Sequence, residues 1–216
     1  AFYNPGLTSV YLPKNVTKIG SKAFWHCASL TTVGFDRDSV YQELPEECFK
    51  DCGALKNITF GKIDYLAALA FGNCASIESV DLTNVLSLDS TAFDGCTALQ
   101  NVTYMDSDSA EKATVSASAF NDTDSLKTVM LGSSVESVED LAFANCEELQ
   151  TVYISDEVEK ISASAFQNSD NLTIVCPNTT CYAYSYAVQN NIPVTTLVVS
   201  PIPNQTYTGE ASTPTL

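Results

Sequence analysis

A small residue followed by Phe recurs along most of the chain, and apolar residues keep fixed distances from each Phe. The phenylalanines in this pattern are Phe2, Phe24, Phe49, Phe71, Phe93, Phe120, Phe143 and Phe166. They stand 22 to 27 residues apart, and the longest interval separates Phe93 from Phe120. Six residues after them come Leu30, Leu55, Ile77, Leu99, Leu126, Leu149 and Leu172. Val or Ile recurs just as regularly nine residues after each Phe from Phe24 onwards, so the chain is a repeat protein.

Each unit predicts the same three elements. After the Phe, the alternation Leu30-x-x-Val33-x-Phe35 is typical of a short strand with one buried face. Before the Phe, a second straight segment such as 16–19 is expected. The chain then bends at the Ala-Phe pair in a tight or 3₁₀-like turn that points Phe inward. A single unit cannot bury its own apolar side, so we expect about eight coils stacked into a solenoid with parallel strands.

The stretch from Leu7 to Leu30 follows the pattern Leu-x-x-Val-x-Leu-Pro-x-x-Val-x-x-Ile-Gly-x-x-Ala-Phe-x-x-Cys-x-x-Leu. This pattern resembles the BspA-like leucine-rich repeat of bacterial cell-surface proteins, and the resemblance covers residues 1–197. It implies a leucine-rich-repeat right-handed solenoid, in the α/β class by family, made mostly of short parallel β-strands with 3₁₀ or turn segments. The general rule for crossovers between parallel strands also favours the right hand. Thr123 and Ser169 depart from the motif by replacing its Cys.

The end of the chain predicts a cap and a tail. Residues 181–189 read as a capping helix that closes the last coil, with Thr180 as its N-cap and with Asn190 and Pro193 ending it. Residues 198–216 resemble a linker and the truncated start of a bacterial immunoglobulin-like module. We therefore expect the chain to be a monomeric piece of a larger multidomain surface protein.

Composition excludes several classes of partner. The 216 residues are 45% hydrophobic, which is enough for a substantial core, and they include 26 acidic against 10 basic residues. The resulting net charge of −16 argues against nucleic acid and against anionic membrane surfaces, because both need a cationic face. No apolar run approaches the roughly 20 residues of a membrane-spanning helix.

The eight cysteines mostly follow the repeat. One column, three residues after the Phe, contains Cys27, Cys52, Cys74, Cys96 and Cys146. Thr123 and Ser169 occupy the same column, so it requires a small buried side chain and no disulfide. Side chains in register also point the same way, which suits disulfide geometry poorly. Cys176 and Cys181 lie outside the column, and the sequence leaves open whether they are bridged.

No residue set predicts catalysis, a metal or a cofactor. His26 is the sole histidine, and it adjoins Cys27, whose column faces inward, so we expect a surface histidine on a turn. The triplet 106–108, Asp-Ser-Asp, hints at a calcium loop. It lacks the Gly and Glu that such a loop needs, so a solvated acidic insertion is expected.

Two columns of outward strand positions form a neutral, hydroxyl-rich face. The candidate binding residues on it are Tyr11, Asn57, Thr59, Asp81, Asn101, Thr103, Met130 and Tyr153. Met130 and Tyr153 belong to adjacent units and are of the residue types that anchor interfaces. The plain alternative is that threonines pave the sheet because they favour strands.

We therefore expect a non-catalytic, extracellular adhesion module on the bacterial cell surface. Its partner would be a host or bacterial surface protein or a glycan, with no nucleic acid and no membrane insertion. Two alternatives belong to other classes: a structural spacer that lifts other domains from the surface, and a thiol enzyme, which would need an activated cysteine.

Overall fold

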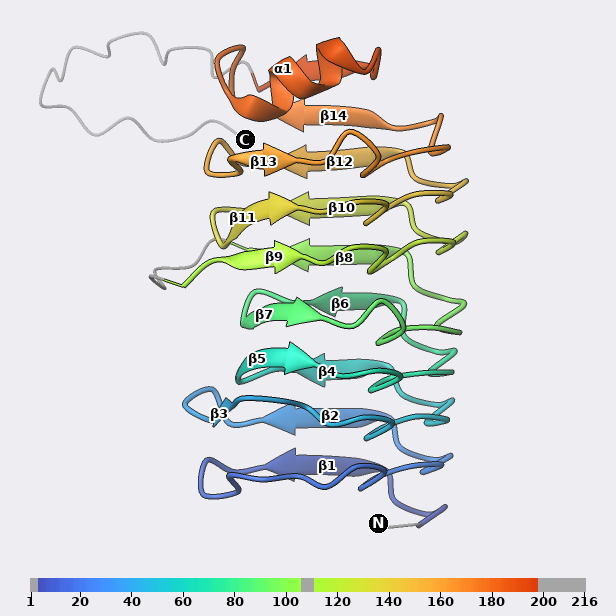
Figure 1. The fold of residues 1–216 in the computed structure, drawn as a ribbon. Helices are drawn as coiled ribbons and strands as arrows, with labels where there is room; N and C mark the ends of the chain where they lie inside the picture. The colour runs from blue at the N-terminus through green and yellow to red at the C-terminus, as the bar shows by residue number, and fades with distance from the viewer. Residues whose placement is uncertain (1–3, 106–110, 198–216) are drawn as a thin grey trace, which may run out of the picture.

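The computed structural model describes residues 4–105 and 111–197, and the chain there forms a solenoid of about eight stacked coils (Figure 1). The strands of one side, here called the front face although Figure 1 views the solenoid from the opposite side, are β1 (Ser9–Leu12), β2 (Thr32–Phe35), β4 (Asn57–Thr59), β6 (Ser79–Asp81), β8 (Asn101–Tyr104), β10 (Thr128–Leu131), β12 (Thr151–Ile154), β14 (Thr173–Cys176) and β15 (Val194–Thr196). A second side carries β3 (Val40–Tyr41), β5 (Lys62–Leu66), β7 (Val85–Leu88), β9 (Ala113–Val115), β11 (Val135–Val138) and β13 (Lys160–Ile161). Each coil is named below by its Phe, so that β6 and β7 belong to the Phe93 coil.

All strand pairs are parallel, as predicted, but neither side forms one continuous sheet. The front face divides into β1-β2-β4 and β6-β8-β10-β12-β14-β15. The second side divides into β3-β5-β7 and β9-β11-β13. In the Phe24 coil the expected second segment, 16–19, forms no strand. The repeat therefore fixes which coils are neighbours, while strand pairing between them is interrupted once on each side.

The core is a column of stacked rings, which confirms the predicted inward Phe positions. The rings of Phe24 and Phe49 have centroids 5.0 Å apart and are nearly parallel, and Phe71 continues the stack at 5.4 Å from Phe49. The repeated Leu positions are buried as well; Leu30 and Leu55, for example, are fully buried. Parallel stacking of identical rings follows directly from identical coils placed in register.

The bend at the Ala-Phe pair is a series of tight turns, which is the first of the two predicted forms; no 3₁₀ helix forms there. The residue two positions after each Phe adopts a left-handed backbone conformation, and these residues are His26, Asp51, Asn73, Gly95, Asp122, Asn145 and Asn168. Asn, Asp, His and Gly are the residue types that tolerate positive φ. Around this residue, in most coils, every second backbone N–H donates a hydrogen bond to the next coil.

The predicted cap is present as helix α1 (Tyr182–Gln189), which covers the last coil with Ala183, Tyr186 and Ala187 (Figure 1). Its N-cap is Cys181 and not Thr180, so that detail of the prediction is wrong. Thr180 is not the cap because the side-chain oxygen of Asn178 accepts the N–H groups of Thr180 and Cys181, at 2.9 and 3.0 Å, and turns the chain first. The triplet 106–108, for which an acidic insertion is expected, and the tail 198–216 lie outside the described residues.

Candidate functional site

The cysteine column has a hydrogen-bonding role in addition to its small size. Four thiols of the column donate to the carbonyl oxygen of the Phe in the preceding coil: Cys52 to Phe24, Cys74 to Phe49, Cys96 to Phe71 and Cys146 to Phe120, with sulfur–oxygen distances of 3.2 to 3.3 Å. Ser169 makes the same bond to Phe143 at 2.8 Å. The column therefore selects a small side chain that can donate a hydrogen bond, which Cys and Ser share.

The environment of these thiols disfavours the reactive thiolate. Burial raises the pKa of Cys52, Cys96 and Cys146 to about 12, and it raises the pKa of Cys74 further. A thiol enzyme needs a cysteine whose pKa is lowered, so burial works against that alternative. All eight cysteines are free in the structure, including the pair left open by the sequence. The thiol of Cys181 donates to the carbonyl of Asn178 at 3.1 Å.

His26 lies exposed on its turn, as predicted, at a left-handed position with its ring 5.6 Å from that of Trp25. Within 4–105 and 111–197, no group of three or more His, Cys, Asp or Glu side chains is arranged to hold a metal ion. In the same residues no helix is both long and apolar enough to cross a bilayer.

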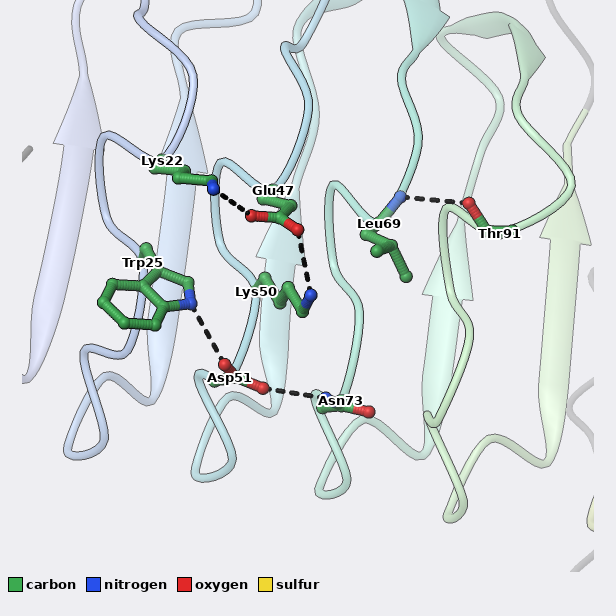
Figure 2. Close-up of polar contacts among 8 residues, drawn as sticks. All are labelled: Lys22, Trp25, Glu47, Lys50, Asp51, Leu69, Asn73 and Thr91. Atoms are coloured by element: carbon green, nitrogen blue, oxygen red, sulfur yellow. Dashed lines mark hydrogen bonds and ion pairs between the residues drawn. The ribbon is translucent and has the colours of Figure 1, made fainter.

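A row of polar contacts follows the turns from coil to coil (Figure 2). The Asp51 carboxylate accepts the indole N–H of Trp25 at 3.0 Å on one side and the side-chain amide of Asn73 at 2.8 Å on the other (Figure 2). Farther along, Asn145 donates to Asn121 at 3.1 Å and Asn168 to Asn145 at 2.8 Å. These contacts, called the amide ladder below, join the left-handed residues Asp51, Asn73, Asn145 and Asn168 to one another or to a residue directly after a Phe, Trp25 or Asn121.

Glu47 lies beside this row and bridges two lysines. Its carboxylate is 2.9 Å from Lys22 and 2.9 Å from Lys50 (Figure 2). Hydrogen bonds from Lys22 and then Lys50 hold the pKa of Glu47 below its usual value. The next coils are joined at the equivalent level by the backbone N–H of Leu69, which donates to the hydroxyl of Thr91 at 3.2 Å. The contacts of Glu47 with Lys22 and of Leu69 with Thr91 thus link neighbouring coils.

Main-chain hydrogen bonds join the turns as well. The N–H of Phe71 donates to the carbonyl of Ala92 at 2.9 Å, and the N–H of Asn73 donates to that of Asp94 at 2.7 Å. The same two bonds recur, with equivalent residues, between the other neighbouring Phe coils of the described chain, with one exception.

That exception lies between the Phe93 and Phe120 coils. Among the described residues, the N–H groups of Phe93 and Gly95 have no hydrogen-bond partner, and Thr123 makes no bond to the Phe93 carbonyl. The Phe93 and Phe120 rings are 6.1 Å apart and tilted by 22°, whereas the rings of Phe71 and Phe93 are 5.3 Å apart and tilted by 7°. The second side is also interrupted here, because β7 and β9 belong to different sheets, while β6 and β8 stay paired.

The structure divides the predicted face residues between the two front sheets. Tyr11, Asn57 and Thr59 lie on β1-β2-β4, whereas Asp81, Asn101, Thr103, Met130 and Tyr153 lie on the larger sheet. In the larger sheet, Asp81, Thr103, Met130 and Tyr153 are opposite one another on four successive strands, β6, β8, β10 and β12. We call these four residues the front patch.

The front patch presents two large apolar side chains to solvent. Met130 is 36% exposed and Tyr153 is 39% exposed, and they are direct neighbours across β10 and β12. The structure adds Met105, 47% exposed just after β8, which the outward columns did not include because it follows the last strand residue. Met105 comes two residues after Thr103, and this spacing could have placed it on the same face, since alternate strand residues share a face.

Tyr11 occupies a different setting. Its ring lies over Gly34, the opposite residue on β2, where an added Cβ would come within 3.2 Å of the ring. Its hydroxyl donates to the carboxylate of Asp36 at 3.1 Å. Tyr11 is therefore remote from the front patch and already paired within its own sheet.

Cavities occur at both ends and at the interrupted level. One of about 440 Å³ lies between the Phe166 coil and the cap, and an apolar one of about 760 Å³ lies against the first coil. A third, of about 290 Å³, lies at the turns of the Phe93 and Phe120 coils and is called the notch.

Comparison with known proteins agrees with this architecture. A family model described as the BspA-type leucine-rich repeat region, in six copies, matches residues 1–112 and 110–208. A search of curated protein sequences finds no match.

Solved structures share the fold at low identity. The TLR13–ssRNA13 complex matches with a TM-score of 0.56 and 14% identity over 78% of this chain. The Drosophila Toll–Spatzle complex matches with a TM-score of 0.52 and 17% identity over 80% of this chain. This chain covers 24% of each of those chains. A Treponema pallidum leucine-rich-repeat protein matches with a TM-score of 0.42 and 17% identity, covering 89% of this chain and 86% of its own.

Proposed function

The chain belongs to the BspA-type leucine-rich repeat family, and from that premise we propose that it is a non-catalytic extracellular binding module of a bacterial surface protein. The front patch is its docking surface, and the partner is a protein with an adhesive role. Solenoids commonly bind through the extended surface that their strands create.

The observation that carries the proposal is the pairing of Met130 with Tyr153, which the exposed Met105 accompanies and polar residues border. Large flexible or aromatic side chains supply most of the binding energy at protein interfaces, and they do so where polar neighbours exclude water around them. Asp81 and Thr103 supply such a polar border on the neighbouring strands. The net charge of −16 keeps the molecule soluble while the patch itself carries one charged residue.

The thiols of the Cys column are buried and hydrogen-bonded, so this repeated position stabilises the coils. The front patch, by contrast, is exposed and can contact a partner. The spacer alternative differs in one respect that can be measured: it requires no partner at the patch.

The test is an array of immobilised extracellular-matrix and bacterial surface proteins, with glycans as a separate panel. The double variant Met130→Ala plus Tyr153→Ala should weaken binding by about thirtyfold, the loss of roughly 2 kcal/mol expected for an interface anchor. Tyr11→Ala is the control, a more exposed tyrosine on the other front sheet, and should bind as the parent does. Equal binding by the double variant would reject the front patch, and absence of any ligand on the arrays would favour the spacer.

A further inference from the structure

The notch results from several interruptions at a single level of the solenoid. The ring stack widens, two main-chain hydrogen bonds are missing, and the thiol column is interrupted by Thr123. The amide ladder is interrupted as well, because its position in the Phe93 coil is Gly95, which has no side chain to reach Asn73 or Asn121. The Nδ2 of Asn121 donates instead to its own neighbour Asp122, at 2.9 Å.

The polar groups that line the notch are of both kinds, donors and acceptors. The N–H groups of Phe93 and Gly95 are donors without a partner among the described residues. The carboxylates of Asp94 and Asp124 are acceptors, and within the described chain neither is paired with a cation or a hydrogen-bond donor. Thr97 and Thr123 add hydroxyl groups that can donate or accept.

This mixture restricts the ligand. A bare cation would meet the N–H donors of Phe93 and Gly95, and an anion would meet the carboxylates of Asp94 and Asp124. A neutral hydroxyl group satisfies both, since it accepts from an N–H and donates to a carboxylate. An extended peptide would need a continuous open edge, but the turns on both sides of the notch are closed by main-chain hydrogen bonds.

We propose that the notch binds one sugar ring of a glycan. Its volume of about 290 Å³ lies at the lower limit of ligand pockets, which suits a single ring and excludes a longer saccharide from being enclosed. Phe93, Cys96 and Ala119 supply the apolar part of the lining, against which one face of the sugar rests. The site is on the turns and shares no residue with the front patch, so it stands independently of the proposed docking function.

The test is a titration of the ¹⁵N-labelled chain with individual monosaccharides: glucose, galactose, mannose, fucose, N-acetylglucosamine and N-acetylgalactosamine. At least one should give saturable chemical-shift changes centred on the amides of Phe93, Gly95, Asn121 and Thr123. If none of the six shifts these amides saturably at concentrations up to tens of millimolar, the proposal is wrong.

Two variants separate a specific site from general effects. Gly95→Asn supplies the missing rung of the amide ladder at a position whose φ of 74° Asn tolerates. The added Cβ would contact the flexible side chain of Asn73 and lie 3.2 Å from its Cα, so Asn73 must shift slightly to accept it. This variant should fold and lose the sugar response. Asp124→Asn, at an exposed position that no fold contact requires, should weaken the response about tenfold.

The front-patch double variant serves as the matched control, and it should respond to the sugar as the parent does. A sugar response that survives both Gly95→Asn and Asp124→Asn, or that disappears in the front-patch variant, would overturn the assignment to the notch.

Discussion

The thiol of Cys74 donates a hydrogen bond to the carbonyl oxygen of Phe49 in the preceding coil, with 3.2 Å between sulfur and oxygen. That oxygen also accepts the N–H of Cys52, at 3.3 Å, so both acceptor positions of a buried carbonyl are used. The two residues that define the repeat, Phe and Cys, are therefore linked physically as well as by spacing. The ring fills the core, and the thiol donates a hydrogen bond to the turn that contains the Phe of the preceding coil.

Replacing this thiol should distinguish a donor from a mere filler. Cys74→Ser keeps a donor, as Ser169 does naturally, whereas Cys74→Ala removes it. We expect the Ala variant to be less stable than the Ser variant by about 1 kcal/mol, the usual net value of one hydrogen bond. Urea unfolding of the two variants measures the difference; equal midpoints would show that only size matters in the column.

Alkaline pH should destabilise the fold through the same thiols. Burial raises the pKa of Cys52, Cys96 and Cys146 from 9.0 to about 12. The unfolded chain therefore releases these protons first, so the stabilisation is complete below pH 9.0 and is lost progressively as the pH approaches 12. Unfolding free energy measured against pH should be flat around neutrality and fall in that window.

Labelling provides an independent measurement on the same groups. In the native state at pH 8 the column cysteines should resist a thiol-specific reagent until denaturant is added, because the thiolate is the reactive form. Rapid labelling of Cys74 in the folded protein would contradict the burial that the structure assigns to it.

Removing one ring from the stack should cost far more than removing a thiol. Phe71 is fully buried and stacks on Phe49 and Phe93 at 5.4 and 5.3 Å. Phe71→Ala should lower the free energy of unfolding by about 3–5 kcal/mol, and Phe71→Leu by less, because Leu fills most of the space. Thermal unfolding ranks the variants. A cost of under about 1 kcal/mol for Phe71→Ala would mean that the rings do not carry the core.

The front patch makes the opposite prediction for stability. Met130 and Tyr153 point to solvent, so their double Ala variant should unfold within about 0.5 kcal/mol of the parent. A large loss would indicate that the two side chains support the sheet, and it would remove the reason for treating them as a docking surface.

Most of the architecture could be predicted from the sequence because the repeat is explicit. The spacing of Phe71 and its equivalents established the coils, and the alternation in Leu30-x-x-Val33-x-Phe35 established the strands. The Cys column was recognised as buried, but its donor role was missed. The signal was present: Ser169 in the same column shares with Cys a small size and a hydrogen-bond donor.

The turn geometry also had an overlooked signal. Positions two after each Phe are restricted to Asn, Asp, Gly and His, which is the composition of left-handed turn residues. The interruption at the notch had three signals: the interval of 27 residues before Phe120, Gly95 in place of an amide or carboxylate, and Thr123 in place of Cys. Each alone is ordinary variation, and only their coincidence at one level marks a site.

Other features had no local signal. The gap between β4 and β6 is one such feature, because the apolar column continues without change through Ile58 and Val80 on these two strands. The N-cap could not be assigned from the sequence, because Asn178 and Thr180 are both favourable turn or cap residues. In the structure the side-chain oxygen of Asn178 accepts the N–H groups of Thr180 and Cys181.

The most direct test of the stacked-coil account is native-state hydrogen exchange at three equivalent amides. The N–H groups of Phe71 and Phe120 bond to the next coil at 2.9 Å each, whereas that of Phe93 has no partner among the described residues and borders the notch. We predict slow exchange at Phe71 and Phe120, close to the rate of global unfolding, and fast exchange at Phe93. Equal protection of all three amides would contradict the interrupted ladder, and fast exchange at all three would contradict the stacking itself.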